Sequence, residues 1–245
     1  MQNSTVTFIL ALIAGTAPAL FWLWYWIKED DVCRPPLGLI ALTFISGMLM
    51  VMFVIPLEKF FADRLTDRST LIVIWAACEE ILKFTACSII ALRSEYIEEP
   101  IDYAIYCMTV AFGFAALENT LFLLQPVGLQ NTTVALLTTN LRFLGSTLLH
   151  GVSTSFIGLM IGLSFYQPKV IRVISFFVGF ALAIGLHSIF NFFIMNNNGE
   201  NFLQVFAFLW VVSIINILVF EKVRRMSQHA YVKKIRMQYG APNPS

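Results

Sequence analysis

Long apolar stretches separated by short polar breaks run along the chain from near its start to about residue 220. A helix of about 20 residues crosses the roughly 30 Å of hydrocarbon in a bilayer. The breaks are polar or turn-forming strings such as KEDDVCRPP, RSEYIEEP and NNNGEN. The pattern predicts about seven membrane spans, at Val6–Ile27, Leu37–Pro56, Ser69–Leu92, Ile101–Leu124, Arg142–Phe165, Val170–Met195 and Phe202–Phe220.

Two of the apolar segments can each be interpreted in two ways. Val134–Leu141 either extends the fifth span or forms a short interfacial helix before it. The first span lacks a positively charged start and ends in the aromatic cluster FWLWYW, which favours an anchored helix over a signal peptide. We expect an all-α, polytopic transmembrane bundle: one domain over residues 1–221, with its motifs within 69–195, and a basic cytoplasmic tail over 222–245.

Composition supports a membrane protein. Hydrophobic residues make up 58% of the 245 residues and charged residues 13%, and the mean hydropathy is +0.76, which leaves too little polar surface for a soluble globule. The net charge of +1 argues against nucleic acid as a partner. The four cysteines form no CxxC motif, and most fall within spans, so no extracellular disulfide framework is indicated.

Basic residues are distributed unevenly between the two sides of the predicted bundle. One side receives only Lys59, Arg64 and Arg68, and the other receives Lys28, Arg34, Arg93, Lys169, Arg172 and the six basic residues from Lys222 to Arg236. The positive-inside rule puts the C-terminus in the cytoplasm and the N-terminus outside. The tail is expected to be solvated, with a basic amphipathic segment on anionic lipid as the alternative.

Several strongly polar residues interrupt the predicted spans. An ionisable group at mid-bilayer costs at least a few kcal/mol, so such groups usually face the bundle interior and mark function. Counted from the span ends, the polar groups of the fourth, fifth and sixth spans lie on the order of 9–12 Å below one surface, and Glu79 about 15 Å. The residues concerned are Glu79, Glu80, Lys83, Glu118, Asn119, His150, His187 and Asn191.

Neighbouring side chains support this grouping. Thr147 and Thr154 share a helix face with His150, where their hydroxyls could orient the imidazole. Lys83 lies within reach of Glu80 on its own helix, and this pair is equally consistent with a buried structural ion pair.

Carboxylates, imidazoles and an amide together supply what hydrolysis of a peptide bond requires. They offer a general base for water, ligands for a zinc-type ion and a donor for an oxyanion. Ser153 near His150 and Ser188 beside His187 leave a serine nucleophile open, although water is favoured because neither serine clearly pairs with a histidine.

Four motifs in this order resemble the PrsW family of intramembrane proteases, which is distantly similar to CAAX prenyl endopeptidases and bacteriocin-processing proteins. They are EEILK from Glu79, FAALEN from Phe114, the isolated His150, and HSIFN from His187. The resemblance covers roughly residues 69–191. It implies cleavage of a single-pass membrane protein in a bacterial-type cytoplasmic membrane, in the best-known member an anti-sigma factor cut on its extracytoplasmic side as the first step of regulated signalling.

The resemblance also implies roles for individual residues. Glu79 would be the base that activates water, Glu80 would support it or hold Lys83, and Asn191 would position the oxyanion. Zinc or another divalent metal would be bound by Glu118, His150 and His187, with Lys83 and Asn119 as structural support. A metal-free mechanism stays open, because one has been proposed for the related prenyl endopeptidases, and Glu118 stands where those proteins carry a histidine.

Two other functions remain as alternatives. Intramembrane glutamate, histidine and lysine could relay protons in an ion-coupled transporter, although seven spans do not divide into halves and no internal repeat is visible. The chain could also be an inert relative that binds transmembrane helices. Cleavage that requires Glu79 would distinguish a protease from both.

Overall fold

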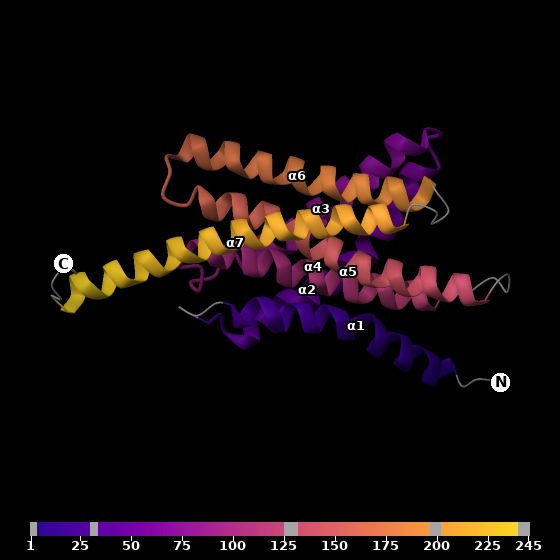
Figure 1. The fold of residues 1–245 in the computed structure, drawn as a ribbon, viewed down its shortest axis with the longest axis horizontal. Helices are drawn as coiled ribbons and strands as arrows, with labels where there is room; N and C mark the ends of the chain where they lie inside the picture. Colours follow the sequence, from indigo (N-terminus) through magenta and orange to yellow (C-terminus); the bar gives the residue numbers. More distant parts are fainter. Residues whose placement is uncertain (1–3, 30–33, 125–131, 197–201, 240–245) are drawn as a thin grey trace.

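The computed structural model describes residues 4–29, 34–124, 132–196 and 202–239, and all regular structure in these ranges is helical. Figure 1 shows the helices aligned along one long axis, with the two termini at opposite ends. The predicted all-α bundle is therefore confirmed. Its helices are α1 (Ser4–Lys28), α2 (Leu37–Ala62), α3 (Arg68–Ile90), α4 (Pro100–Leu123), α5 (Thr132–Leu163), α6 (Lys169–Asn196) and α7 (Phe202–Tyr239).

Six of the described helices are long and apolar enough to cross a membrane, so the chain is an integral membrane protein. The exception is α3, which has 23 residues but carries Glu79, Glu80 and Lys83 in its second half. Its length matches that of its neighbours, and only its charges set it apart. The helix that least resembles a membrane span by composition is thus the one that brings most charge into the bundle.

Three helix bounds differ from the predicted spans. Pro56 lies inside α2, which continues to Ala62, because a membrane helix tolerates the lost backbone hydrogen bond of a proline. The segment Val134–Leu141 is a continuous part of α5. Helix α7 runs on as one helix to Tyr239, across the predicted boundary at residue 221, and the division into domain and tail stays a prediction.

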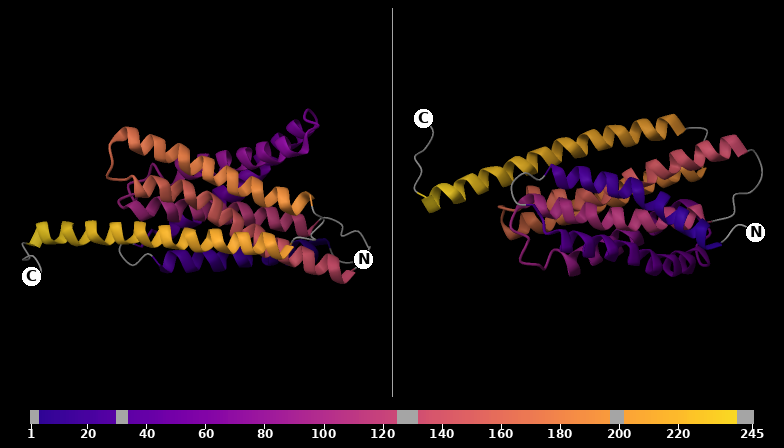
Figure 2. Two further views of the ribbon diagram at one scale, coloured as in Figure 1. Left: turned by 45° about the horizontal axis from the view of Figure 1, so that its top comes forward. Right: turned by 90° about the horizontal axis from the view of Figure 1, so that it is seen from below.

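Helix α4 lies at the centre of the bundle. Of its most apolar window 89% is buried, whereas the corresponding shares are 22% for α1, 28% for α6 and 33% for α2 and α7. It packs against α1, α2, α3, α5 and α7, whereas α6 lies on the outside of the bundle (Figure 2). Large apolar side chains on the outer faces of these peripheral helices are exposed, as expected where a helix faces lipid.

Helices α2 and α4 touch backbone to backbone. A side chain on Gly47 would collide with the carbonyl of Val110, and one on Gly113 with the carbonyl of Phe44. Small residues at membrane helix contacts allow this close approach. The contact fixes α2 against the central helix on the side of the bundle next to α3.

Capping side chains set the starts of α3 and α4. Asp67 accepts hydrogen bonds from the backbone N–H and the hydroxyl of Thr70, and these bonds hold the pKa of the Asp67 carboxyl below its usual value. At α4, the Asp102 carboxylate accepts from the backbone N–H of Glu98 and of Glu99, ahead of Pro100 in the first turn. A fixed start determines which later side chains face inward.

Polar contacts hold α7 to the rest of the bundle at the predicted cytoplasmic end. Arg224 lies 2.8 Å from the carboxylate of Glu29, just after α1. The backbone N–H of Ile101 donates to the Ser227 hydroxyl at 3.2 Å. Deeper in the bundle, Asn216 donates to the hydroxyl of Ser155 on α5, so the register of α7 is set at several levels.

Candidate active site

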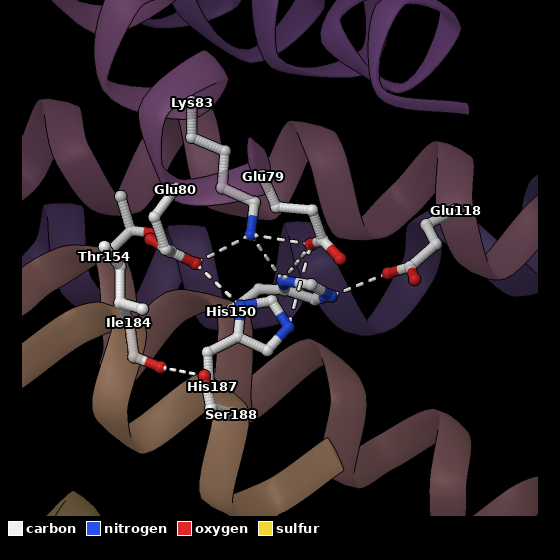
Figure 3. Close-up of polar contacts among 9 residues, drawn as sticks. All are labelled: Glu79, Glu80, Lys83, Glu118, His150, Thr154, Ile184, His187 and Ser188. Carbon is white, nitrogen blue, oxygen red and sulfur yellow. Dashed lines mark hydrogen bonds and ion pairs between the residues drawn. The ribbon is translucent and has the colours of Figure 1, made fainter. Parts of the chain in front are cut away.

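Polar side chains from α3, α4, α5 and α6 meet in one buried cluster (Figure 3). Helix α3 contributes a glutamate pair and a lysine, and each of the other three helices contributes at least one group that contacts them directly or through a neighbour. The predicted convergence of these groups at one level of the membrane is therefore seen as direct contact. The members are Glu79, Glu80, Lys83, Glu118, His150 and His187.

The Lys83 ammonium lies at the centre of the cluster. Its Nζ is 2.9 Å from Glu80 Oε1, 3.2 Å from Glu79 Oε2 and 2.8 Å from His150 Nδ1. The ring of Phe114 lies beneath it, with 4.4 Å from Nζ to the centroid. The side chain is 0% exposed, and its three N–H donors match these three acceptors in number.

Glu80 is fully engaged in holding its neighbours. Its Oε1 lies 2.9 Å from both Lys83 Nζ and His187 Nδ1, and its Oε2 accepts from the Thr154 hydroxyl at 2.7 Å. A carboxylate with every contact committed to the protein is suited to orienting other groups rather than to reacting. The Thr154 hydroxyl, which we expected to orient His150, binds Glu80 instead.

Both imidazoles are held by a carboxylate on one side and face the cluster with the other nitrogen. His187 Nδ1 contacts Glu80, and His150 Nε2 lies 2.6 Å from Glu118 Oε2. An ionised carboxylate only accepts, so these nitrogens donate. In the neutral rings the remaining nitrogens, Nε2 of His187 and Nδ1 of His150, then carry the lone pairs.

The Glu79 carboxylate lies near both of these nitrogens. Its Oε2 is 3.7 Å from His150 Nδ1 and 3.7 Å from His187 Nε2. Among the described residues, Glu79, His150 and His187 form the group of metal-type ligands whose donor atoms all lie within 4.8 Å of one another. Two imidazoles and one carboxylate are a common ligand set for zinc with a fourth position left open.

Glu118 occupies a different place from the one its predicted role as a metal ligand suggests. It contacts the outward-facing nitrogen of His150, and its side chain is 42% exposed, against 6% for Glu79. This position favours orienting the imidazole, in the way that carboxylates commonly support metal-binding histidines. It also marks where the cluster comes nearest to the outside of the protein.

The remaining predicted site residues lie around this centre. Asn119 donates to the Thr147 hydroxyl at 2.9 Å, which is an α4–α5 hydrogen bond of the supporting kind. Asn191 is half-buried on α6, one turn beyond His187. Ser188 donates to the carbonyl of Ile184 in its own helix at 2.6 Å, so its hydroxyl is committed away from His187.

Sequence reasoning missed Glu58. The predicted second span ends at Pro56, which leaves Glu58 in the following loop. In the structure α2 continues, and the backbone carbonyl of the half-buried Glu58 accepts from Trp75 Nε1 at 3.1 Å. The longer helix therefore brings a further carboxyl into the neighbourhood of Glu79.

The charges of the cluster support binding of a cation. Two buried carboxylates, Glu79 and Glu80, share one ammonium, that of Lys83, and the partly exposed Glu118 adds a third carboxylate beyond His150. Uncompensated buried charge is costly, and a divalent ion bound by the Glu79, His150 and His187 group would balance it. Such an ion would compete with Lys83 for His150 Nδ1.

Comparison with known proteins agrees with the motifs. The model of the PrsW family, described as intramembrane metalloproteases, matches residues 35–218. A protein named protease PrsW from Geobacillus kaustophilus is 28% identical over 114 residues, covering 45% of this chain and 51% of its own. One of the same name from Oceanobacillus iheyensis is 29% identical over 116 residues, covering 46% and 54%. The chain thus spans about half the length of these curated relatives, and no solved structure matches.

Proposed function

The chain belongs to the PrsW family of intramembrane metalloproteases, and on that premise we propose that it hydrolyses a peptide bond of a membrane-anchored protein. The observation that carries the proposal is the group of Glu79, His150 and His187 inside a membrane bundle, with each imidazole oriented by a further carboxylate. A transporter relay would not need two imidazoles and a carboxylate whose ligand atoms all lie within 4.8 Å of one another.

In the proposed mechanism Glu79 accepts the proton of the attacking water. Its carboxylate is the acceptor that faces both imidazoles, whereas Glu80 is bound on both oxygens. Glu58, whose carboxyl lies in the neighbourhood of Glu79, could in its protonated form return a proton to the leaving amine. Asn191, one turn beyond His187, keeps its predicted role as a donor to the oxyanion.

His150 and His187 would hold a divalent metal ion beside the Glu79 carboxylate, since the ligand atoms of the three residues lie within 4.8 Å of one another. When bound, such an ion would polarise the scissile carbonyl and favour ionisation of water. The protein's own contribution is orientation. Glu118 and Glu80 fix the two rings, and the surrounding helices limit access of bulk water to the buried centre.

The proposed substrate is a single-pass membrane protein of the anti-sigma-factor kind, cut near the outer surface of a bacterial cytoplasmic membrane. The basic ends of the helices support a cytoplasmic C-terminus. The cluster lies toward the opposite end of the bundle, because Glu118 is five residues before the end of α4. Both features favour access from outside.

Cleavage by the purified protein in liposomes tests this function. We expect cleavage of a single-pass substrate to fall more than about 100-fold in His187→Ala, because losing a ligand costs at least as much as losing a group that orients one. His229→Ala, on the tail part of α7, is the matched control and should cleave normally. Cleavage that persists in His187→Ala would reject the assigned site, and substrate-independent proton flux would instead support a transporter.

Metal content can be measured without a substrate. We expect about one zinc or other divalent ion per freshly purified chain, and its loss in His150→Ala and in His187→Ala, since each removes one of the two imidazole ligands. The His229→Ala protein should keep its metal. A wild-type chain that contains no metal and cleaves normally in the presence of chelators would favour the metal-free alternative.

A further inference from the structure

A second site lies at the predicted cytoplasmic end of the bundle, away from the cluster. Between α5 and α6 there is a cavity of about 440 Å³. Two of its lining side chains are cations from the first turn of α6, and the other three are apolar. The lining residues are Ile161, Lys169, Arg172, Val173 and Phe176.

The two cations of this cavity differ from two arginines at the same end of the bundle. Arg224 and Arg225 on α7 are paired with Glu221, and Arg224 also with Glu29. Within the described part of the chain, neither Lys169 nor Arg172 has a carboxylate at ion-pair distance. The first backbone N–H groups of α6 add partial positive charge at the same end. The cavity therefore combines unbalanced positive charge with an apolar wall.

We propose that this cavity binds an anionic phospholipid. The lipid phosphate would bind Lys169 and Arg172, and the start of an acyl chain would lie against Ile161, Val173 and Phe176. The site lies where the apolar span of α6 begins, at Lys169, which is the depth at which a lipid changes from charged headgroup to hydrocarbon. A free phosphate would leave the apolar wall uncovered, so the lipid accounts for both halves of the cavity.

The proposed lipid would also brace the helices that carry the cluster. Phe176 lines the cavity and packs on Phe84 of α3, with ring centroids 5.1 Å apart. Phe84 follows Lys83 in the chain, and it also contacts Phe180 of α6 at 5.2 Å. A chain packed on Phe176 would therefore stabilise the α3–α6 contact one residue from the central ammonium.

Native mass spectrometry of the purified protein in neutral detergent tests the proposal with phosphatidylglycerol and phosphatidylcholine as probes. We expect the wild type to bind phosphatidylglycerol preferentially. In a Lys169→Gln, Arg172→Gln double variant this binding should weaken about 30-fold, because each basic group near a membrane surface contributes about 1 kcal/mol. Phosphatidylglycerol should also raise the unfolding temperature of the wild type more than that of the double variant.

An Arg93→Gln, Lys222→Gln double variant is the matched control, since both residues are exposed, lie at the same end and do not line the cavity. It should bind phosphatidylglycerol like the wild type. Equal binding by the cavity variant would overturn the proposal. So would equally tight wild-type binding of glycerophosphate, which would reveal a simple anion site. Neither lipid binding nor the unfolding temperature depends on proteolysis. A negative result here would therefore leave the test of the proposed function unaffected.

Discussion

Replacing Glu79 with glutamine should lower cleavage of a membrane-anchored substrate by about 10²–10⁴, the usual contribution of a general base. Glutamine keeps the size of the side chain and an oxygen that can accept from Lys83, so the helices should still pack. What it loses is the carboxylate that lies 3.7 Å from each imidazole. Initial rates in liposomes, with thermal unfolding as a check of folding, measure the effect.

Cys78→Ala is the control for this variant, because Cys78 is the preceding residue and is half-buried on the same helix. We expect it to cleave nearly as the wild type does. Metal analysis of Glu79→Gln distinguishes a role in metal binding from a role in proton transfer. A variant that keeps its metal through His150 and His187 but does not cleave would assign Glu79 to proton transfer. Full cleavage by Glu79→Gln would remove the residue from the mechanism.

Replacing Lys83 with methionine should destabilise the protein more than any other single change in the cluster. Methionine fills similar space, but it leaves Glu79 and Glu80 in the bundle without their shared cation. Breaking a buried ion pair in this way costs about 3–5 kcal/mol, which corresponds to a fall of about 10 °C in unfolding temperature for a chain of this size. Differential scanning fluorimetry in detergent measures it.

Two further variants show whether charge is the cause. Adding Glu80→Gln to Lys83→Met removes the most buried of the unpaired charges and should restore much of the stability. Arg225→Met breaks an ion pair with Glu221 in which the arginine is 68% exposed, and it should cost less than about 1 kcal/mol. If Lys83→Met unfolds at the wild-type temperature, the cluster does not depend on this ammonium.

The fold was largely predictable because membrane spans are marked by long apolar runs, and seven runs became seven described helices. Helix ends were predicted less reliably where the chain contains a proline or charged residues. The buried positions Gly47, Val51 and Val54 of α2 repeat at intervals of four and three, and the next step of four reaches Glu58. This periodicity identifies Glu58 as inward-facing, but it is visible only if the helix is allowed to continue past Pro56.

The sequence predicted which residues form the site, but it said less about which side-chain atoms contact one another. Depth along successive helices grouped His150, His187 and the glutamates, since depth depends only on position in the chain. Which ring nitrogen faces which carboxylate depends on how the helices are rotated against one another, and the sequence does not specify this. For that reason the sequence could not show that Glu118 contacts the His150 nitrogen that faces away from Glu79, or that the Thr154 hydroxyl donates to Glu80 rather than to the imidazole.

The backbone contact at Gly47 and Gly113 bears on how a peptide could enter. Helices that touch through carbonyls and glycines lose this close packing if they slide or separate, so we expect α2 and α4 to move together. By contrast, α3 contacts α6 through the rings of Phe84, Phe176 and Phe180. Aromatic side chains can change rotamer without moving the backbone of either helix. Opening for an incoming peptide should therefore be easiest along this aromatic seam.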